Sequence, residues 1–280
     1  MKIIIHGGFF SESHTDPVTK KKKQDGLIAI VKQSYEYLKT HTALEAVTYA
    51  VSLLEDDALF NAGIGSQIQS DGKIRMSASI MDGVTEKFSG VINIEETKNP
   101  IQVALKLLPY DDRVLGGEGA TGFARQNGFD AFSTEIPQRR SEYEAKVASQ
   151  GLGTVGAVAI DNDGNIAAAT STGGKGFEIP GRISDSATVA GNFANSFCGV
   201  SCTGVGEDIV SNATAAKIVT RVTDGLLLAD AFEKTFTELK AIDGFAGAIA
   251  IDRDGNVFHK DSHPSMVYAK FDGEEVSVFE

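Results

Sequence analysis

Hydrophobic and polar positions in the first half of the chain repeat with two different periods. Apolar residues three or four positions apart indicate amphipathic helices, and short runs rich in β-branched residues indicate strands. Helices are therefore expected at residues 27–38, 43–54, 101–108 and 121–126, with Thr42 capping the second. Strands are expected at residues 2–5, within 66–80 and at 88–94, with a loop from the first strand to about Lys23.

The second half opens with a change of pattern. Residues 128–153 are charged and lack a strong apolar stripe, which indicates an exposed helix followed by a flexible connector. Strands are then expected at residues 154–160, 165–170, 187–191 and 199–202, and helices at 209–222 and 228–240. Antiparallel hairpins outnumber clear strand–helix–strand units, so we expect an α+β fold in which helices cover a two-sheet core.

One ten-residue pattern occurs twice. Residues Gly156–Asn165 read GAVAIDNDGN and residues Gly247–Asn256 read GAIAIDRDGN. A calcium loop of similar spacing needs a glutamate at its twelfth position, where this chain has Thr172 and His263. Both copies therefore predict β-hairpins with Asp-Gly turns.

Charge and composition exclude several classes of function. The net charge is -12, and nucleic-acid binding normally needs a basic face. The basic run Lys20–Lys23 is too short for a binding patch and is interpreted as a solvated loop. Two cysteines are too few for a disulfide framework. The amino-terminal apolar run is too short for a signal peptide, and no run reaches ~20 apolar residues, so we expect a cytoplasmic protein without a membrane span.

Catalytic motifs based on histidine or on a nucleophile elbow are missing. The five histidines are scattered, and neither G-x-S-x-G nor H-E-x-x-H occurs. Four clusters of small polar residues and glycine fall within 55 residues of the second half instead, each beside an expected strand end. They are Gly153–Gly156, Thr170–Gly174, Gly181–Ser186 and Thr203–Glu207.

A threonine nucleophile can act without histidine if its own α-amine is the base. A threonine hydroxyl is a weak nucleophile near pH 7, whereas a free α-amine has a pKa of ~8. Thr154 has an α-amine only after cleavage of the Gly153–Thr154 bond. Gly153 has no Cβ, so this bond tolerates the strained backbone that intramolecular attack requires.

The same clusters carry a family resemblance that covers nearly the whole chain. The motifs are HGG at residues 6–8, LFNAGIGS, MDG, GEGA, GTVGAVAID, AATSTGG, GR-x-x-DS and TG-x-GE, in this order. With them the sequence resembles the plant-type asparaginases, also called isoaspartyl peptidases, within the N-terminal-nucleophile hydrolases. The resemblance implies a four-layer αββα sandwich forming one domain, 1–280, that cuts itself into an α chain, 1–153, and a β chain, 154–280.

The resemblance also implies residue roles in hydrolysis of asparagine and β-aspartyl dipeptides. Thr154 attacks the side-chain carbonyl carbon, and Thr172 orients Thr154. The hydroxyl of Thr203 and the N–H of Gly204 form the oxyanion hole.

Substrate binding is assigned to three further residues by the resemblance. Arg182 holds the α-carboxylate, and Asp185, helped by the Gly206 carbonyl, holds the α-ammonium. From the residues alone, a surface ion pair between Arg182 and Asp185 is an equally good interpretation.

Further implications concern a structural sodium ion and assembly. No catalytic cofactor is implied. Asn61 supports the nucleophile, and the subunits form an (αβ)₂ homodimer. The sodium ion is held by the carbonyls of Leu54, Glu55, Asp57, Phe60, Ala62 and Ile64.

The sequence departs from the family pattern near the proposed substrate groups. Phe9 and Phe10 stand where the family has alanine and glycine, Ser184 replaces a glycine, and Val205 replaces a histidine. These changes leave the preference between asparagine and isoaspartyl peptides open. Two alternatives remain, a glycosylasparaginase with the same chemistry and a non-catalytic binding protein on the same fold.

Overall fold

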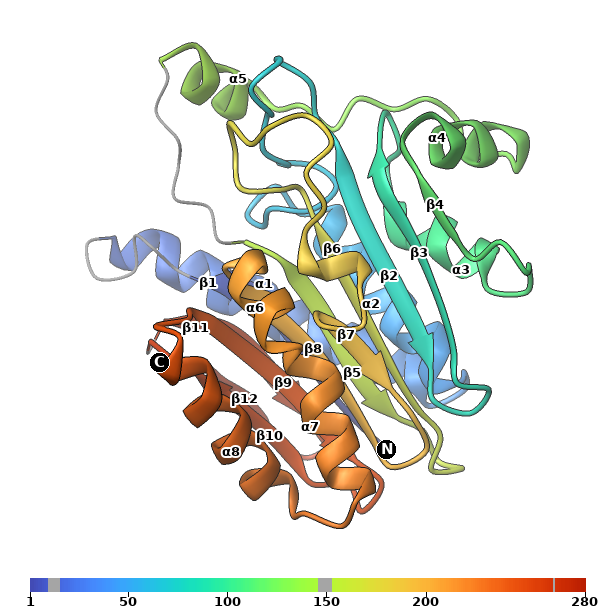
Figure 1. The fold of residues 1–280 in the computed structure, drawn as a ribbon, viewed down its shortest axis with the longest axis vertical. Coiled ribbons are helices and arrows are strands. Elements are labelled where there is room, and N and C mark those ends of the chain that lie inside the picture. The colour runs from blue at the N-terminus through green and yellow to red at the C-terminus, as the bar shows by residue number, and fades with distance from the viewer. Residues whose placement is uncertain (10–15, 146–152, 264) are drawn as a thin grey trace.

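Two β-sheets stacked face to face form the centre of the molecule (Figure 1). The computed structural model describes residues 1–9, 16–145, 153–263 and 265–280. Within these described residues, the larger sheet has eight strands, of which only β3 and β4 pair in parallel. Its spatial order is β12 (Val276–Val278), β11 (Met266–Phe271), β1 (Lys2–Phe9), β5 (Val155–Ile160), β6 (Ile166–Thr172), β2 (Met76–Asp82), β3 (Lys87–Ile94) and β4 (Val114–Gly116).

The smaller sheet is antiparallel and lies against the middle of the larger one. Its spatial order is β10 (Val257–Asp261), β9 (Ala246–Asp252), β8 (Cys198–Gly204) and β7 (Asn192–Ala194). Apolar side chains such as Val158, Ile166 and Ile249 fill the space between the sheets. Strands β5 and β6 are buried along their whole length, which explains their continuous apolar runs.

Helices cover the outer face of each sheet (Figure 1). The larger sheet is covered by α1 (Pro17–Leu38), α2 (Ala43–Glu55) and α3 (Pro100–Leu107). The smaller sheet is covered by α7 (Thr214–Thr223) and α8 (Leu228–Ala241). The remaining helical segments are α4 (Gly117–Gln126), α5 (Pro137–Glu144), the 3-10 turn η1 (Asp185–Ala187) and α6 (Gly206–Asn212). This arrangement confirms the expected α+β class.

The predicted helix with Thr42 as its cap is confirmed. The Thr42 hydroxyl accepts from the Glu45 N–H at 3.3 Å, and the Glu45 carboxylate accepts from the Thr42 N–H at 2.9 Å. This reciprocal capping box satisfies two amides that the helix itself cannot pair. Both predicted hairpins, β5–β6 and β9–β10, also form.

Four local predictions were wrong. Lys20–Lys23 belongs to α1 rather than to a loop, because the Asp16 side chain caps the helix and Pro17 occupies its first turn. The predicted strand at 187–191 is a turn, since Thr188 bonds back to the Asp185 carbonyl. The helix predicted at 209–222 breaks where Ala213 adopts φ 51°. Within 66–80, the strand begins only at Met76.

Other expectations meet the structure only in part. Both cysteines are buried free thiols, which agrees with the predicted lack of a disulfide framework. The predicted exposed helix before the connector is α5, but residues 146–152 of that connector lie outside the described residues. No described helix is both long and apolar enough to cross a membrane.

Candidate active site

Thr154 lies immediately before β5 with its side chain buried. Its hydroxyl donates to the Thr172 hydroxyl across 3.3 Å, and the Gly174 N–H donates to the same oxygen across 3.2 Å. The bond fixes the Thr154 side chain against the end of β6. The structure thus brings the predicted nucleophile and its predicted orienting residue together.

The register between the two sheets decides which residue of the smaller sheet faces Thr154. A Cβ on Gly199 would lie 2.8 Å from Ile166 and 2.9 Å from Val158. Two residues further along β8, the Ser201 hydroxyl lies 2.6 Å from the Thr170 hydroxyl. Strand β8 therefore advances in the same direction as β6, with alternate residues facing the larger sheet.

The next residue on this face of β8 is Thr203. Because Thr172 follows Thr170 by the same step along β6, we expect Thr203 to lie near the end of β6, where Thr172 and Thr154 meet. The Thr203 hydroxyl is fully buried and has no hydrogen-bond partner among the described residues. A buried donor without a partner costs about 1–3 kcal/mol, so this hydroxyl is a candidate donor to a ligand oxygen.

Gly204 follows with a backbone that only glycine adopts readily. Its φ is 132°, and a Cβ there would lie 2.6 Å from the Phe245 carbonyl oxygen. The chain turns here from β8 into α6, which begins at Gly206. Thr203 and Gly204 thus occupy a sharply constrained strand end.

Arg182 pairs with Glu207 rather than with Asp185. Its Nε and Nη2 donate to the two Glu207 carboxylate oxygens at 2.8 and 3.0 Å. These bonds, together with the charge of nearby Lys175, lower the pKa of Glu207 to about 2. The interpretation of Arg182 and Asp185 as a surface ion pair is therefore wrong. Glu207 belongs to the TG-x-GE motif, which is the signal that could have identified this partner.

Asp185 is buried beside the same guanidinium without an ion pair of its own. Its Oδ2 has no hydrogen-bond partner in the described part of the chain. Burial raises the pKa of Asp185 to about 7, against the opposing charge of Arg182. A Cβ on Gly206 would lie 2.9 Å from both Arg182 Nη2 and Asp185 Oδ1. Glycine at this position lets both charged side chains approach the start of α6 closely.

Comparison with known proteins identifies the family. A family model described as Asparaginase matches residues 1–145 and 132–279. The chain belongs to the plant-type asparaginase and isoaspartyl peptidase family.

Relatives in this family match over almost their whole length. An isoaspartyl peptidase/L-asparaginase of Nostoc sp. is 43% identical over 296 residues, covering 98% of this chain and 93% of that protein. An isoaspartyl peptidase of Escherichia coli is 39% identical, covering 91% and 88%. A plant-type L-asparaginase of Pyrococcus furiosus is 36% identical, covering 95% of both chains.

Asn61 joins the loop after α2 to the turn after β6 in this family member. Its side-chain Nδ2 donates to the Gly174 carbonyl at 2.5 Å, and its backbone carbonyl accepts from the Gly173 N–H at 2.8 Å. A Cβ on Gly153 would come within 2.6 Å of the Asn61 Cβ. Asn61 therefore packs directly against the residue that precedes Thr154.

Backbone hydrogen bonds within the loop around Asn61 hold its two ends together. The Ile64 N–H donates to the Glu55 carbonyl at 2.7 Å, and the Phe60 N–H donates to the Asp57 carbonyl at 3.0 Å. The Glu55 carboxyl accepts from the Ser171 hydroxyl at 2.6 Å, and burial raises its pKa to about 8. Glu55 thus ties the loop to β6 from the helical side of the sheet.

The departures from the family pattern fall in two places. Phe9 packs on Phe245, with ring centroids 4.4 Å apart, so it belongs to the core between the sheets. Ser184 caps η1 by accepting from the Ser186 N–H at 3.3 Å, and Val205 is the half-buried cap residue of α6. Phe10 lies outside the described residues.

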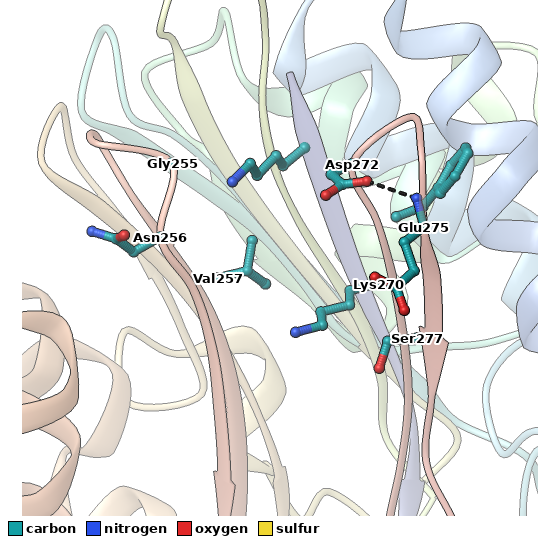
Figure 2. A pocket seen from close by; sticks show the side chains of 9 residues that line it. Gly255, Asn256, Val257, Lys270, Asp272, Glu275 and Ser277 are labelled. Atoms are coloured by element: carbon teal, nitrogen blue, oxygen red, sulfur yellow. Dashed lines mark hydrogen bonds between the residues drawn. The ribbon is translucent and has the colours of Figure 1, made fainter.

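A separate cavity of about 420 Å³ opens between the β9–β10 turn and the β11–β12 hairpin (Figure 2). Strand β1 reaches it at Lys2, which is paired with Ile160, whereas His6 is paired with Gly156 and bonds to Thr154. Four residues of strand correspond to about 13 Å, so this cavity lies at the opposite end of β1 from Thr154. It is lined by Lys2, Gly255, Asn256, Val257, Lys270, Phe271, Asp272, Glu275 and Ser277.

Proposed function

We propose that this protein is a self-processing isoaspartyl peptidase and L-asparaginase that uses Thr154 as its nucleophile. The observation that carries the proposal is the hydrogen bond between the buried Thr154 and Thr172 hydroxyls, and the unpartnered, buried Thr203 hydroxyl at the end of β8 supports it. The names and identities of the relatives support the same activity.

Cleavage of the Gly153–Thr154 bond comes first. It divides one domain of 280 residues into an α chain, 1–153, and a β chain, 154–280, on a four-layer αββα sandwich of the N-terminal-nucleophile type. The stacked sheets with helices on both outer faces support this architecture. The close packing of Gly153 against Asn61 supports the cleavage site, because it confines the bond that must be attacked.

The freed α-amine of Thr154 then serves as the base. It removes the hydroxyl proton as Oγ1 attacks the side-chain carbonyl carbon of the substrate. The C–N bond breaks, and ammonia or the amine of the second residue leaves with that proton. Water hydrolyses the resulting ester, releases aspartate and restores Thr154. Thr172 keeps Oγ1 aligned through its 3.3 Å bond.

The oxyanion hole consists of the Thr203 hydroxyl and the Gly204 N–H. The buried Thr203 hydroxyl gains a partner when negative charge forms on the carbonyl oxygen. One such donor typically contributes about 3 kcal/mol of transition-state stabilisation. The constrained backbone at Gly204 supports a fixed direction for its N–H.

Arg182, Asp185 and Gly206 recognise the free α-groups of the aspartyl moiety. The Arg182 guanidinium binds the α-carboxylate, while its bond to Glu207 keeps the planar group in place. The α-ammonium supplies the missing partner of Asp185 Oδ2, assisted by the Gly206 carbonyl. Substrates therefore need both α-groups unblocked.

A structural sodium ion fits the loop between α2 and Ile64. The carbonyls of Glu55 and Asp57 accept backbone N–H groups at 2.7 and 3.0 Å, and a carbonyl oxygen has a second lone pair that can bind a hard cation. The proposed ligands are the carbonyls of Leu54, Glu55, Asp57, Phe60, Ala62 and Ile64. Replacing sodium by tetramethylammonium at constant ionic strength should lower the melting temperature, and unchanged melting contradicts this site.

The assembly and location proposals rest on the family resemblance. We expect an (αβ)₂ homodimer in the cytoplasm, with small-molecule substrates and neither nucleic acid nor membrane as partner. Light scattering of the purified protein measures its assembly, and a single αβ unit would contradict the dimer.

A denaturing gel and three substrates test the central proposal. The mature protein should give fragments of 153 and 127 residues, with Thr154 at the amino terminus of the second. It should hydrolyse β-aspartyl dipeptides and asparagine. Hydrolysis of an asparagine-linked sugar alone favours the glycosylasparaginase alternative. One uncut 29.6 kDa band without activity favours a binding protein.

A further inference from the structure

His6 is a fully buried histidine that contacts the nucleophile residue from β1. Its Nδ1 lies 3.0 Å from the Thr154 carbonyl oxygen, and its Nε2 lies 2.8 Å from the Ser201 hydroxyl. The Ser201 hydroxyl lies 2.6 Å from the Thr170 hydroxyl. The chain of bonds therefore runs from β6 through the smaller sheet to Thr154.

The Thr154 carbonyl, at the end of this series of hydrogen bonds, determines which atom donates in each bond. The Thr154 carbonyl only accepts, so Nδ1 of His6 must carry a hydrogen. In the neutral ring Nε2 must then accept, so Ser201 donates to it. The Ser201 oxygen in turn accepts from Thr170, whose alternative bond to the Gly191 carbonyl is much longer, at 3.5 Å.

Burial keeps the imidazole in this neutral form. It lowers the pKa of His6 to about 3, against a raising effect of the bond to Thr154. The ring therefore stays uncharged across the pH range in which a free α-amine acts as a base. A neutral ring with a fixed hydrogen is a directional donor, not an acid or a base.

Gly156 provides independent support, because the His6–Ser201 bond passes directly over its Cα. A Cβ at this position would lie 2.4 Å from His6 Nε2 and 2.0 Å from Ser201 Oγ. These distances are far below van der Waals contact. Glycine in the GTVG segment thus leaves the room that the bond occupies, although the φ of this residue does not require glycine.

We propose that His6 is a positioning residue for Thr154, held in its Nδ1–H tautomer by Ser201 and Thr170. The inference rests on the proposed function of Thr154. The Thr154 carbonyl lies on the carboxyl-terminal side of the cleaved bond, so the His6 bond persists after cleavage. By fixing this carbonyl, His6 orients the Thr154 α-carbon, and hence its α-amine and hydroxyl, toward Thr203.

Nitrogen-15 NMR of the purified mature protein tests the tautomer without reference to activity. The His6 signals are assigned by their loss in His6→Asn. We expect a neutral Nδ1–H ring that does not titrate between pH 5 and 9. An Nε2–H tautomer, or titration near pH 6.5, overturns the proposal.

Two substitutions at His6 separate positioning from packing. Asparagine places its amide nitrogen as many bonds from Cα as Nδ1, so His6→Asn keeps the donor to Thr154, whereas His6→Leu removes it. With a β-aspartyl dipeptide, we expect kcat to fall about 100-fold in His6→Leu and less than about tenfold in His6→Asn, with KM nearly unchanged. Equal losses in both variants, or a change confined to KM, contradict positioning.

Ser201→Ala offers a milder test if His6→Leu does not fold. It leaves the imidazole in place but removes the donor that fixes its tautomer, so we expect kcat to fall about tenfold with a smaller change in melting temperature than in kcat. Ser34→Ala is the matched control, because Ser34 is an equally buried serine whose hydroxyl donates to the Ile30 carbonyl within α1. An unchanged kcat in Ser201→Ala contradicts the proposal. An inactive wild-type protein refutes the proposed function instead, while the NMR result still decides the His6 tautomer.

Discussion

The hairpins Gly156–Asn165 and Gly247–Asn256 share a sequence pattern and a local structure but have different surroundings. In each, the first aspartate accepts from the backbone N–H groups two and four residues later, at 2.9–3.0 Å for Asp161 and 2.8–3.0 Å for Asp252. In each, the side chain of the last asparagine donates to the carboxylate of that aspartate, Asn165 to Asp161 and Asn256 to Asp252. Local sequence therefore determined the turn in the same way twice.

The first glycine of each hairpin shows the difference. A Cβ on Gly156 would meet the polar atoms of His6 and Ser201, whereas a Cβ on Gly247 would meet Met266 at 2.7 Å and Phe9 at 2.9 Å. One hairpin passes beneath a buried hydrogen-bond chain beside Thr154, and the other passes beneath apolar packing. The comparison teaches that a repeated pattern carries the proposed chemistry only where other strands supply polar partners.

The largest expected effect concerns the residue that precedes the first hairpin. Thr154→Ala removes the hydroxyl needed for both self-cleavage and turnover, so the chain should remain at 29.6 kDa and activity should fall by at least about 10⁴-fold. A gel and a β-aspartyl dipeptide assay measure this. Normal cleavage in this variant would show that Thr154 is not the nucleophile, and the proposed difference between the two hairpins would then be wrong.

The second prediction concerns the charged groups Arg182 and Glu207, which lie beside the end of β8. Arg182→Ala should spare cleavage but lower kcat/KM by about 100- to 1000-fold, because a charge-assisted contact to substrate is lost. Arg140→Ala is the control, since Arg140 holds Glu135 through a similar two-atom contact on α5. If Arg182→Ala and Thr154→Ala both remain uncut, Arg182 acts in processing and its proposed role is wrong.

The third prediction compares the two glycines directly. Gly156→Ala should lower kcat by about 100-fold, because the added methyl group displaces the His6–Ser201 bond. Gly247→Ala should cost about 1–3 kcal/mol of stability through overpacking, with kcat within about threefold of wild type. Melting curves and steady-state kinetics of both variants decide the matter. A similar kcat in the two variants would contradict the proposed difference between the two hairpins.

The fourth prediction uses the pKa of Asp185, raised by burial to about 7 from an ordinary 3.8. Between about pH 4 and 7 the folded protein binds more protons at this site than the unfolded chain. Its contribution to the free energy of unfolding therefore falls as pH rises, by up to about 1.4 kcal/mol per pH unit. The slope difference between wild type and Asp185→Asn in urea titrations measures it, and parallel slopes contradict the shift.

The same shift predicts how the substrate responds to pH. The α-ammonium binds ionised Asp185, so kcat/KM for a β-aspartyl dipeptide should rise as pH passes through about 7. A kcat/KM that falls over this range would exclude ionised Asp185 as the ammonium partner.

The smallest expected effects lie in the turns themselves. Asp161→Ala and Asp252→Ala should each reduce the free energy of unfolding by about 1–3 kcal/mol, because the turn amides lose their acceptors. The loss should be larger for Asp161, whose Oδ2 also accepts from the Ala43 N–H at 3.1 Å at the start of α2. Urea unfolding measures both, and an equal loss would show that the bond to Ala43 contributes little.

Prediction from sequence succeeded where the cause was local. Helix period, the Thr42 cap and the Asp-Gly turns each depend on residues a few positions apart, and α2 and both hairpins follow them. It failed where a local signal was misread or where tertiary contacts decided the outcome. The capping of α1 by Asp16 is an example of the first, and the break at Ala213 is an example of the second.

The sequence by itself determined the α+β class, the family motifs and the identity of the candidate residues. Only the tertiary structure decided their partners: Arg182 with Glu207 rather than Asp185, and His6 with Thr154 and Ser201. The physical reason is distance along the chain. His6 lies 148 residues from Thr154 and 195 from Ser201, and no periodicity or turn rule specifies which buried donor meets which acceptor across two sheets.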